Sequence, residues 1–249
     1  MDLGLEGRTA LVTAASRGIG FGIARALAAE GARVAVSSRS QERIEAAAGE
    51  IGARAYVHDS SDVDGAAALV QQVESDLGPL DVLVTSTGGP PPSADSLELS
   101  REQWEDAYRQ LVLEPIALIT PALAGMRERG FGRILGVSSS SAREPIPGLM
   151  LSTAHRAGLL GAYKQLAREV ARDGVTVNTL LPGRIATDRM EENYGSLEAA
   201  EEAAAGQVPS GRLGRVEEIA AAAAFLCSEP ASYVTGVALL VDGGLTQSV

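Results

Sequence analysis

Short apolar runs of strand length alternate with helical patterns along the whole chain of 249 residues. The strand-like runs, rich in Val, Leu and Ala, lie at 10–12, 34–36, 53–57, 81–85, 133–137, 175–181 and 237–241. Helical patterns occupy 41–50, 66–77, 100–129, 152–172 and 216–226. This alternation predicts an α/β fold in which a parallel sheet of about seven strands is covered by helices on both faces. Ligands of such sheets bind at the carboxyl ends of the strands.

The long helical segment 100–129 carries its own start and break signals. Ser100 and Gln103 have the spacing of a capping box, which begins a helix. Pro115 and Pro121 are expected to kink or divide this helix, because proline removes a backbone donor. No linker or change in composition divides the chain, so we expect one domain over residues 1–249.

The segment from Thr13 to Gly20 reads Thr-Ala-Ala-Ser-Arg-Gly-Ile-Gly and joins the first strand-like run to a helix with one apolar face. A helix N-terminus presents free N–H groups, and its dipole favours a phosphate. Gly18 and Gly20 leave room for a pyrophosphate to approach the backbone. The alternative is a plain strand-to-helix turn, because short glycine turns are common in α/β proteins.

Composition excludes several classes of protein. The net charge of −11 argues against general nucleic-acid binding. One cysteine, Cys227, excludes an internal disulfide and fits a reducing compartment. No apolar run reaches the length of a membrane span, and residues 1–8 contain no signal-peptide core. We therefore expect a cytoplasmic protein without nucleic-acid or membrane partners, and no metal site.

An ordered set of segments resembles the short-chain dehydrogenase/reductase family over nearly the whole chain. The turn at 13–20 resembles Thr-Gly-x-x-x-Gly-x-Gly, with Ala14 in place of the first glycine. Gly88 matches the last residue of an Asn-Asn-Ala-Gly segment, and 182–187 is similar to Pro-Gly-x-x-x-Thr. Segments 233–236 and 241–244 are similar to those of 3-oxoacyl-[acyl-carrier-protein] reductases. The resemblance implies a single-domain Rossmann fold with a doubly wound sheet; the acidic segment at about 184–211 is expected to be the substrate lid.

The resemblance also implies a nicotinamide cofactor. Family members that prefer NAD carry an acidic residue at the end of the second strand, where this chain has Ser38 followed by Arg39. Guanidinium groups suit the charge of a 2′-phosphate, so Arg17 and Arg39 favour NADP over NAD. Two solvated surface arginines are the alternative. The implied cofactor-binding residues are Thr13, Ser16, Arg17, Gly18, Ile19, Gly20, Ser38, Arg39, Asp59, Ser60, Gly88, Arg156, Pro182, Gly183 and Thr187.

The catalytic positions depart from the family pattern. The resemblance implies a serine after the fifth strand, a Tyr-x-x-x-Lys pair on a helix and an asparagine in the long helix before it. Ser139 matches the serine, but Ser152 stands at the tyrosine, Arg156 at the lysine and Leu111 at the asparagine. We take Ser139, Ser152 and Arg156 as the candidate catalytic residues. A polar loop of interchangeable serines is the alternative for Ser139.

Serine and arginine in place of the family's tyrosine and lysine limit the proton transfer that the site can perform. A serine hydroxyl is a far weaker acid than a phenol, and an arginine binds ribose hydroxyls but stays protonated. Losing a positioned general acid typically costs ~10²–10⁴ in rate, of which oxyanion donors such as Ser139 retain part. His155 could protonate near neutral pH, although a packed or solvated helix histidine is the expected interpretation. Tyr163 is roughly 16 Å along the helix from Ser152, which is too far to replace the phenol. His58 is expected near the adenine, away from the reacting groups.

Three functions are compatible with these residues. The first is an NADP-dependent oxidoreductase acting on 3-oxoacyl or similar carbonyl substrates through an altered site, as a homotetramer or dimer. The second is a non-catalytic dinucleotide-binding protein that acts as a sensor or partner subunit. The third is a lyase or isomerase that uses the cofactor only structurally. Turnover of NADPH with a panel of carbonyl compounds separates the first from the second.

Overall fold

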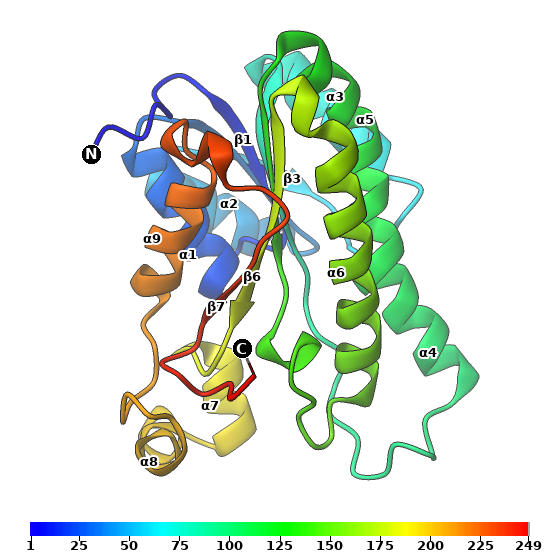
Figure 1. The fold of residues 1–249 in the computed structure, drawn as a ribbon, viewed down its shortest axis with the longest axis vertical. Coiled ribbons are helices and arrows are strands. Elements are labelled where there is room, and N and C mark those ends of the chain that lie inside the picture. The colour runs from blue at the N-terminus through cyan, green and yellow to red at the C-terminus, as the bar shows by residue number, and fades with distance from the viewer. Residues whose placement is uncertain (249) are drawn as a thin grey trace.

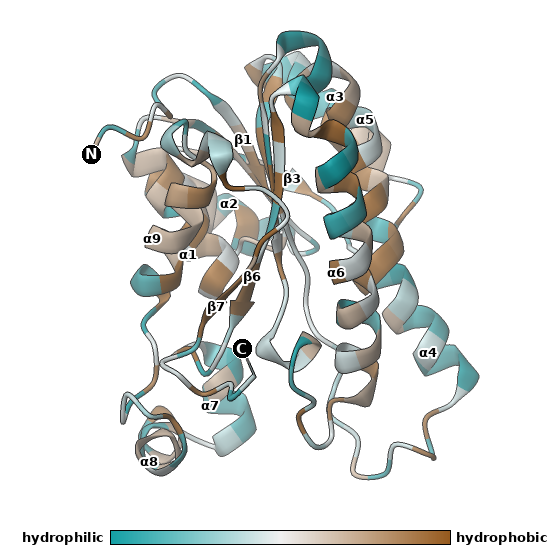
Figure 2. Ribbon diagram, in the orientation of Figure 1, coloured by the Kyte–Doolittle hydropathy of each residue, from teal (hydrophilic) through white to brown (hydrophobic). Residues whose placement is uncertain are grey.

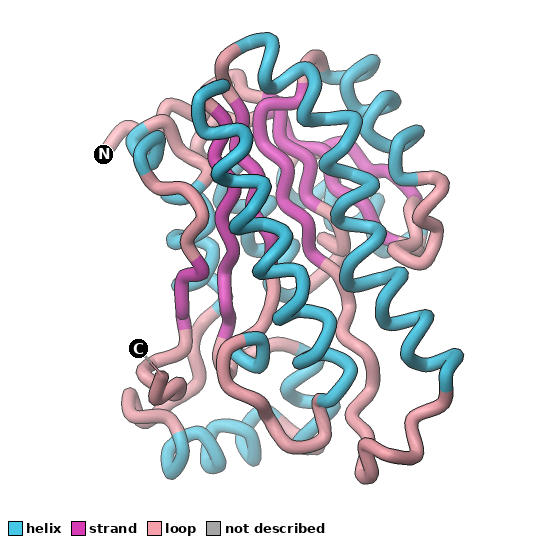
Figure 3. The backbone as a smooth tube through the Cα atoms, turned by 45° about the vertical axis from the view of Figure 1, so that its right-hand side comes forward, coloured by secondary structure: helices cyan, strands magenta, loops and turns pink. Residues whose placement is uncertain are grey.

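Seven parallel strands form one sheet at the centre of the protein, whose computed structural model describes residues 1–248 (Figures 1 and 3). The strands are β1 (Thr9–Val12), β2 (Arg33–Ser38), β3 (Arg54–Val57), β4 (Leu80–Ser86), β5 (Gly132–Val137), β6 (Val175–Pro182) and β7 (Ala238–Val241). Their order across the sheet is β3-β2-β1-β4-β5-β6-β7. The chain therefore begins in the middle and winds outward in both directions. The predicted doubly wound sheet is confirmed, and its order reverses between β1 and β4, where ligands of such sheets bind.

Helices cover both faces of the sheet (Figure 1). One face is covered by α1 (Gly18–Ala29), α2 (Gln41–Ile51) and α9 (Val216–Leu226). The other is covered by α3 (Ala66–Leu77), α5 (Glu114–Arg129) and α6 (Met150–Val170), with α4 (Arg101–Tyr108) before α5. Short 3₁₀ turns lie at Ser140–Ala142, Ala171–Asp173 and Pro230–Tyr233.

Each strand contributes alternate side chains to two apolar cores, because successive residues of a strand point to opposite faces. Val12 and Val36 pack with Ile23 of α1 in one core. Leu11 and Leu83 pack with the helices of the opposite face in the other. Figure 2 shows β6 and β7 largely in the apolar colour, beside helices that carry both polar and apolar residues. Burial on both faces explains why the strands are continuous apolar runs in the sequence.

The long helix predicted at 100–129 is divided. The capping box at Ser100 is present: its hydroxyl accepts from Gln103 N, and the Gln103 side chain accepts from Ser100 N. A π-turn at Arg109–Leu113 separates α4 from α5, and Glu114 N donates to Arg109 O five residues back. Pro115 explains the break, because it has no N–H to donate to the carbonyl of Leu111. Pro121 lies inside α5 without ending it.

The weakly patterned segment 184–211 contains two helices, α7 (Asp188–Tyr194) and α8 (Leu197–Gln207). Both lie beyond the carboxyl ends of the strands, beside the C-terminal part of the chain (Figure 1). A small separate core of Ala200, Ala204, Val208 and Leu213 holds them together. Over residues 1–248, none of the helices is long and apolar enough to span a membrane.

Candidate functional site

The turn between β1 and α1 has the backbone geometry of an anion site. Ala14 and Gly18 both have left-handed backbones, with φ of 48° and 60°. A Cβ on Gly20 would lie 2.7 Å from Ala14 O, so only glycine fits there. Ala14 thus adopts the conformation for which glycine is usual, at the cost of some strain.

The N-terminus of α1 opens at the carboxyl edge of the sheet. Arg17 is its N-cap, and neither a capping side chain nor an acidic residue satisfies the first turn. Thr13 fixes the adjacent strand ends, since its hydroxyl donates to Ser86 O at 2.7 Å and accepts from Ser86 N at 2.9 Å. Free N–H groups and the helix dipole therefore favour an anion at this place.

The loop after β6 lies over this turn. Pro182 is buried at the end of β6, and Gly183 N donates to Val241 O at 3.0 Å. A Cβ on Gly183 would lie 2.6 Å from Asp242 Cα, which requires glycine. Thr187, the N-cap of α7, passes 3.6 Å from the Cβ position of Gly18. The structure thus brings together two sequence-predicted segments about 170 residues apart.

The residues predicted to bind the adenosine half lie along the ends of β2 and β3. Ser38 is buried and donates to Ser40 O, whereas Arg39 is exposed. The Asp59 carboxylate accepts from Ser61 N and from the Ser61 hydroxyl, both at 2.9 Å. These bonds, chiefly the backbone one, and the nearby Arg39 lower the pKa of Asp59. Ser60 is half-buried beside them.

Arg17 is engaged by α7 rather than free. Its guanidinium lies 2.9 Å from Asp188 Oδ2 and 3.3 Å from Glu192 Oε1. These contacts, led by the hydrogen bond to Asp188, raise the pKa of Arg17. The other predicted cofactor-binding residues lie in the segment 13–20 or just after β4. Ser16 and Ile19, in that segment, are half-buried, and Gly88, after β4, is exposed.

The four serines after β5 occupy four different environments. Ser139 is half-buried, and its hydroxyl accepts from Ser141 N at 3.1 Å. The buried Ser141 hydroxyl lies 3.4 Å from the hydroxyl of Ser152. Ser138 Oγ is buried without a hydrogen-bond partner in the described part of the chain, and Ser140 is buried in the 3₁₀ turn. The pairing of Ser152 with Ser141 was not predicted, because only the turn geometry selects one serine among four.

Arg156 is buried and turns toward the sheet. Its Nη1 donates to Val137 O at 3.1 Å, and its Nε has no hydrogen-bond partner among residues 1–248. Burial, followed by repulsion from Arg189, lowers the pKa of Arg156 to about 10. Arg156, Ser138 and Tyr163 line a cavity of about 10 Å³, which is room for about one water molecule. Because its pKa is about 10, the Arg156 side chain remains a cation at neutral pH.

The two alternative acids, His155 and Tyr163, are both engaged with other groups. The His155 ring packs 5.4 Å from Trp104 and 6.0 Å from Tyr108, both on α4, and its Nδ1 lies 2.8 Å from Leu151 O. The Tyr163 hydroxyl hydrogen-bonds Thr85 Oγ1 at 2.8 Å, and burial raises the pKa of Tyr163. Neither side chain takes the place of the missing phenol in this geometry.

Sequence reasoning also missed a buried acid. Glu114, the first residue of α5, is fully buried, and its Oε1 lies 3.4 Å from Nε2 of the buried His58. Burial raises the pKa of Glu114, and His58 opposes this in part. A glutamate between apolar residues next to Pro115 was the only signal in the sequence.

Comparison with known proteins agrees with this geometry. The model of the family described as enoyl-(acyl carrier protein) reductase matches residues 13–246. The chain is 37% identical to the 3-oxoacyl-[acyl-carrier-protein] reductase FabG of Haemophilus influenzae, over 97% of this chain and 99% of that one. It is also 37% identical to the acetoacetyl-CoA reductase of Rhizobium meliloti, covering 95% and 98%.

A solved structure shows the same architecture. L-sorbose reductase from Gluconobacter frateurii, complexed with NADPH and L-sorbose, superposes with a TM-score of 0.94 at 31% identity, over 100% of both chains. A doubly wound sheet with an uncapped helix N-terminus at its switch point is the architecture of dinucleotide-binding proteins. Within that class, this chain belongs to the short-chain dehydrogenase/reductase family.

Proposed function

We propose that this protein is an NADP-dependent oxidoreductase that reduces a carbonyl group, with 3-oxoacyl or similar compounds as its substrate class. The observation that carries the proposal is the uncapped N-terminus of α1, enclosed by Gly18, Gly20 and Thr187. The relatives named above are reductases, which supports catalysis over a purely dinucleotide-binding role.

The residues present fit a nicotinamide dinucleotide. The free N–H groups of α1 suit its pyrophosphate, and the glycine at 20 keeps the turn tight against the helix. Asp59 and Ser60 lie at the adenosine end, whereas Pro182, Gly183 and Thr187 lie where the family holds the nicotinamide amide. Arg39, with Ser38 in place of an acid, suits a 2′-phosphate.

Reduction of a carbonyl requires a hydride at carbon and a proton at oxygen. NADPH supplies the hydride when bound. In this chain, Ser139 is proposed to donate a hydrogen bond to the carbonyl oxygen, where negative charge develops. Ser152, held by Ser141, takes the place of the family's tyrosine, and Arg156 provides a fixed positive charge nearby. The proton then comes from solvent through the serine hydroxyls, which predicts slow turnover compared with a phenol-based site.

Three further properties belong to this proposal. Residues at about 184–211, including α7 and α8, act as the substrate lid of the single domain. The protein acts in the cytoplasm on a small-molecule substrate. It assembles as a homo-oligomer, a tetramer or a dimer.

The test is a titration of NADPH and NADH, followed by turnover with a panel of 3-oxo esters and ketones. We expect NADPH to bind at least ~10-fold more tightly than NADH, and Arg39→Ala to remove most of this preference, since a charged hydrogen bond contributes about 1.5–3 kcal/mol. Equal affinities that Arg39→Ala leaves unchanged contradict the charge argument. Absence of both binding and turnover contradicts the proposed function.

A further inference from the structure

A histidine and a glutamate face each other in the layer between the sheet and α5. The His58 side chain is 5% exposed and the Glu114 side chain 0% exposed, with Nε2 and Oε1 3.4 Å apart. No hydrogen bond is formed between these two atoms, and neither Glu114 oxygen has a hydrogen-bond partner in the described structure. Buried polar groups are normally hydrogen-bonded, so an arrangement of this kind requires an explanation.

The pair is most stable with one proton. A neutral acid beside a neutral ring, or an ion pair, keeps the buried layer without net charge, whereas removal of the proton leaves a buried carboxylate alone. Burial accordingly raises the pKa of Glu114. The titratable groups that face the pair are the Tyr163 phenol from α6 and the Asp59 carboxylate beside His58, with Arg39 next to Asp59. None of these three neighbours supplies a hydrogen bond to Glu114.

The backbone of His58 joins this pair to the adenosine end of the cofactor site. His58 N donates to Ser38 O at 3.0 Å, at the ends of β3 and β2. The next residue is Asp59, whose carboxylate is fixed by Ser61. The buried His58 imidazole therefore holds the turn at 58–61 against the interior of the protein, where it contacts Glu114 of α5.

We propose that His58 and Glu114 are positioning residues that share one proton and hold the turn at 58–61 in place for the adenosine half of the dinucleotide. This inference rests on the proposed function, because it concerns the same cofactor site. It makes cofactor affinity depend on pH: the proton is present at low pH and is lost as pH rises through the raised pKa of Glu114, so affinity falls as pH rises.

The first experiment compares wild type with Glu114→Gln, which has the same shape but cannot ionise. NADPH dissociation constants are measured by fluorescence from pH 6 to 9.5. We expect the wild type and the variant to bind NADPH equally at pH 6. The ratio of the wild-type dissociation constant to that of the variant should then rise ~5-fold or more with pH, which is the low end of typical coupling between two sites. The control is Asp81→Asn, which changes another buried carboxylate. Asp81 lies at the N-terminal end of β4, away from the cofactor site at the carboxyl ends of the strands, so this variant should show the pH profile of the wild type.

The second experiment replaces both groups by apolar residues, His58→Leu with Glu114→Leu. A merely structural pair would leave cofactor binding intact, because apolar replacements of buried polar pairs are often neutral or stabilising. A positioning pair predicts an NADPH KM raised ~10-fold with kcat within ~2-fold of wild type, since the adenosine half lies away from the reacting carbon. His155→Gln, at the only other histidine of the chain, should change neither constant.

A parallel pH dependence in wild type and Glu114→Gln overturns the inference, as does an unchanged NADPH KM in the double-leucine variant. If the double variant does not fold, the Glu114→Gln series decides alone. Failure of the proposed function is distinct, because the wild type itself would then neither bind NADPH nor reduce a carbonyl compound.

Discussion

At the scale of single residues, the chemistry of the site depends on Ser152 and Arg156. Both are buried, and each has a partner inside the protein: the Ser141 hydroxyl for Ser152 and Val137 O for Arg156. Ser152 is only 7% exposed, so a tyrosine ring at this position would have to point into the cofactor cleft.

Restoring the family residues tests whether only the acid is missing. We expect Ser152→Tyr with Arg156→Lys to reduce a simple 3-oxo ester with NADPH at least ~10²-fold faster than the parent, the low end for a regained general acid. Leu111→Asn is then added. Turnover is measured only on variants that bind NADPH, which serves as the control for folding. A variant that binds NADPH without any gain indicates that the substrate side has diverged, and high parental activity indicates another proton donor.

At the scale of elements, α7 decides whether Arg17 is available to the cofactor. Asp188 and Glu192 hold its guanidinium across the opening of the turn between β1 and α1. These ion pairs are exposed, so each contributes about 0–1 kcal/mol at most. A 2′-phosphate carries more charge and should displace them, which makes the acidic residues of α7 competitors of NADP.

Neutralising these two residues should therefore strengthen NADP binding. We expect Asp188→Asn with Glu192→Gln to bind NADPH about 2- to 5-fold more tightly, with NADH affinity unchanged, because a weak competing ion pair is removed. The matched control is Glu191→Gln, a neighbouring exposed residue of the same helix with no ion pair in the described part of the chain. Weaker NADPH binding in the double variant would mean instead that the ion pairs hold α7 closed over the cofactor.

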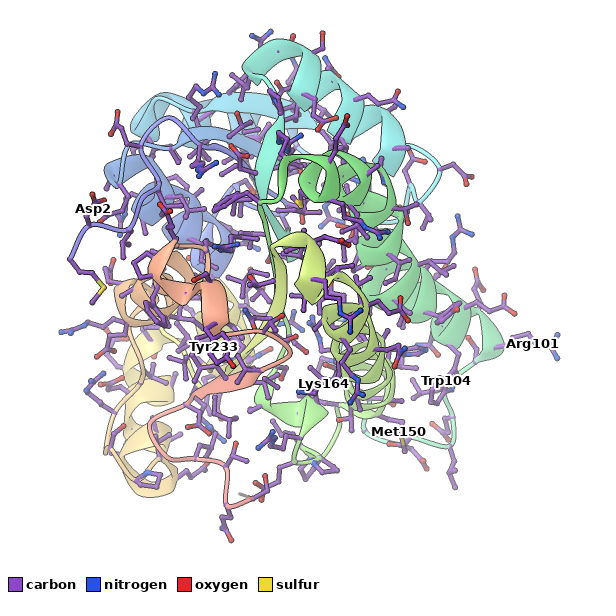
Figure 4. All side chains as sticks on the ribbon, turned by 45° about the horizontal axis from the view of Figure 1, so that its top comes forward. Asp2, Arg101, Trp104, Met150, Lys164 and Tyr233 are labelled. Atoms are coloured by element: carbon purple, nitrogen blue, oxygen red, sulfur yellow. The ribbon has the colours of Figure 1, made fainter. Side chains whose placement is uncertain are left out.

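At the scale of the whole molecule, the outer face of α4 and α6 exposes apolar side chains. Tyr108 and Met150 are 45% and 41% exposed, and the His155 ring of α6 packs against Trp104 and Tyr108 of α4. Figure 4 shows Trp104 and Met150 on this side of the molecule. Exposed apolar side chains are typical of association surfaces, which makes this face the candidate for one.

We therefore expect self-association through this face. Light scattering at micromolar concentration should give a mass of two or four times 25.6 kDa. Tyr108→Arg with Met150→Glu should lower that mass, because charges placed in an apolar interface are left without partners. The control is Leu97→Glu with Tyr233→Arg, which places the same charges at exposed apolar side chains outside these helices. A monomeric mass for the wild type contradicts this prediction.

Much of the fold follows from the sequence because its physical causes are local or periodic. The segments 66–77 and 216–226 are helices with the predicted bounds. The first has an apolar face and ends at Gly78-Pro79, which are typical helix signals. The turn at 13–20 was also readable, because glycine at a left-handed or crowded position has few alternatives. The division of the long helix was expected at prolines, but its form, a π-turn before Pro115, depends on packing against the sheet.

The sequence by itself predicted a parallel sheet covered by helices on both faces and the glycine turn at 13–20, because these features follow from residue type and spacing along the chain. The departures at Ser152 and Arg156 became visible only through the resemblance to the family pattern. Only the tertiary structure decided which serine meets Ser152, that Asp188 and Glu192 engage Arg17, and that Glu114 faces His58. These contacts join residues up to about 175 positions apart, and their partners are fixed by how helices pack on the sheet. No local pattern encodes that geometry, so side-chain pairing across layers had to be seen in the structure.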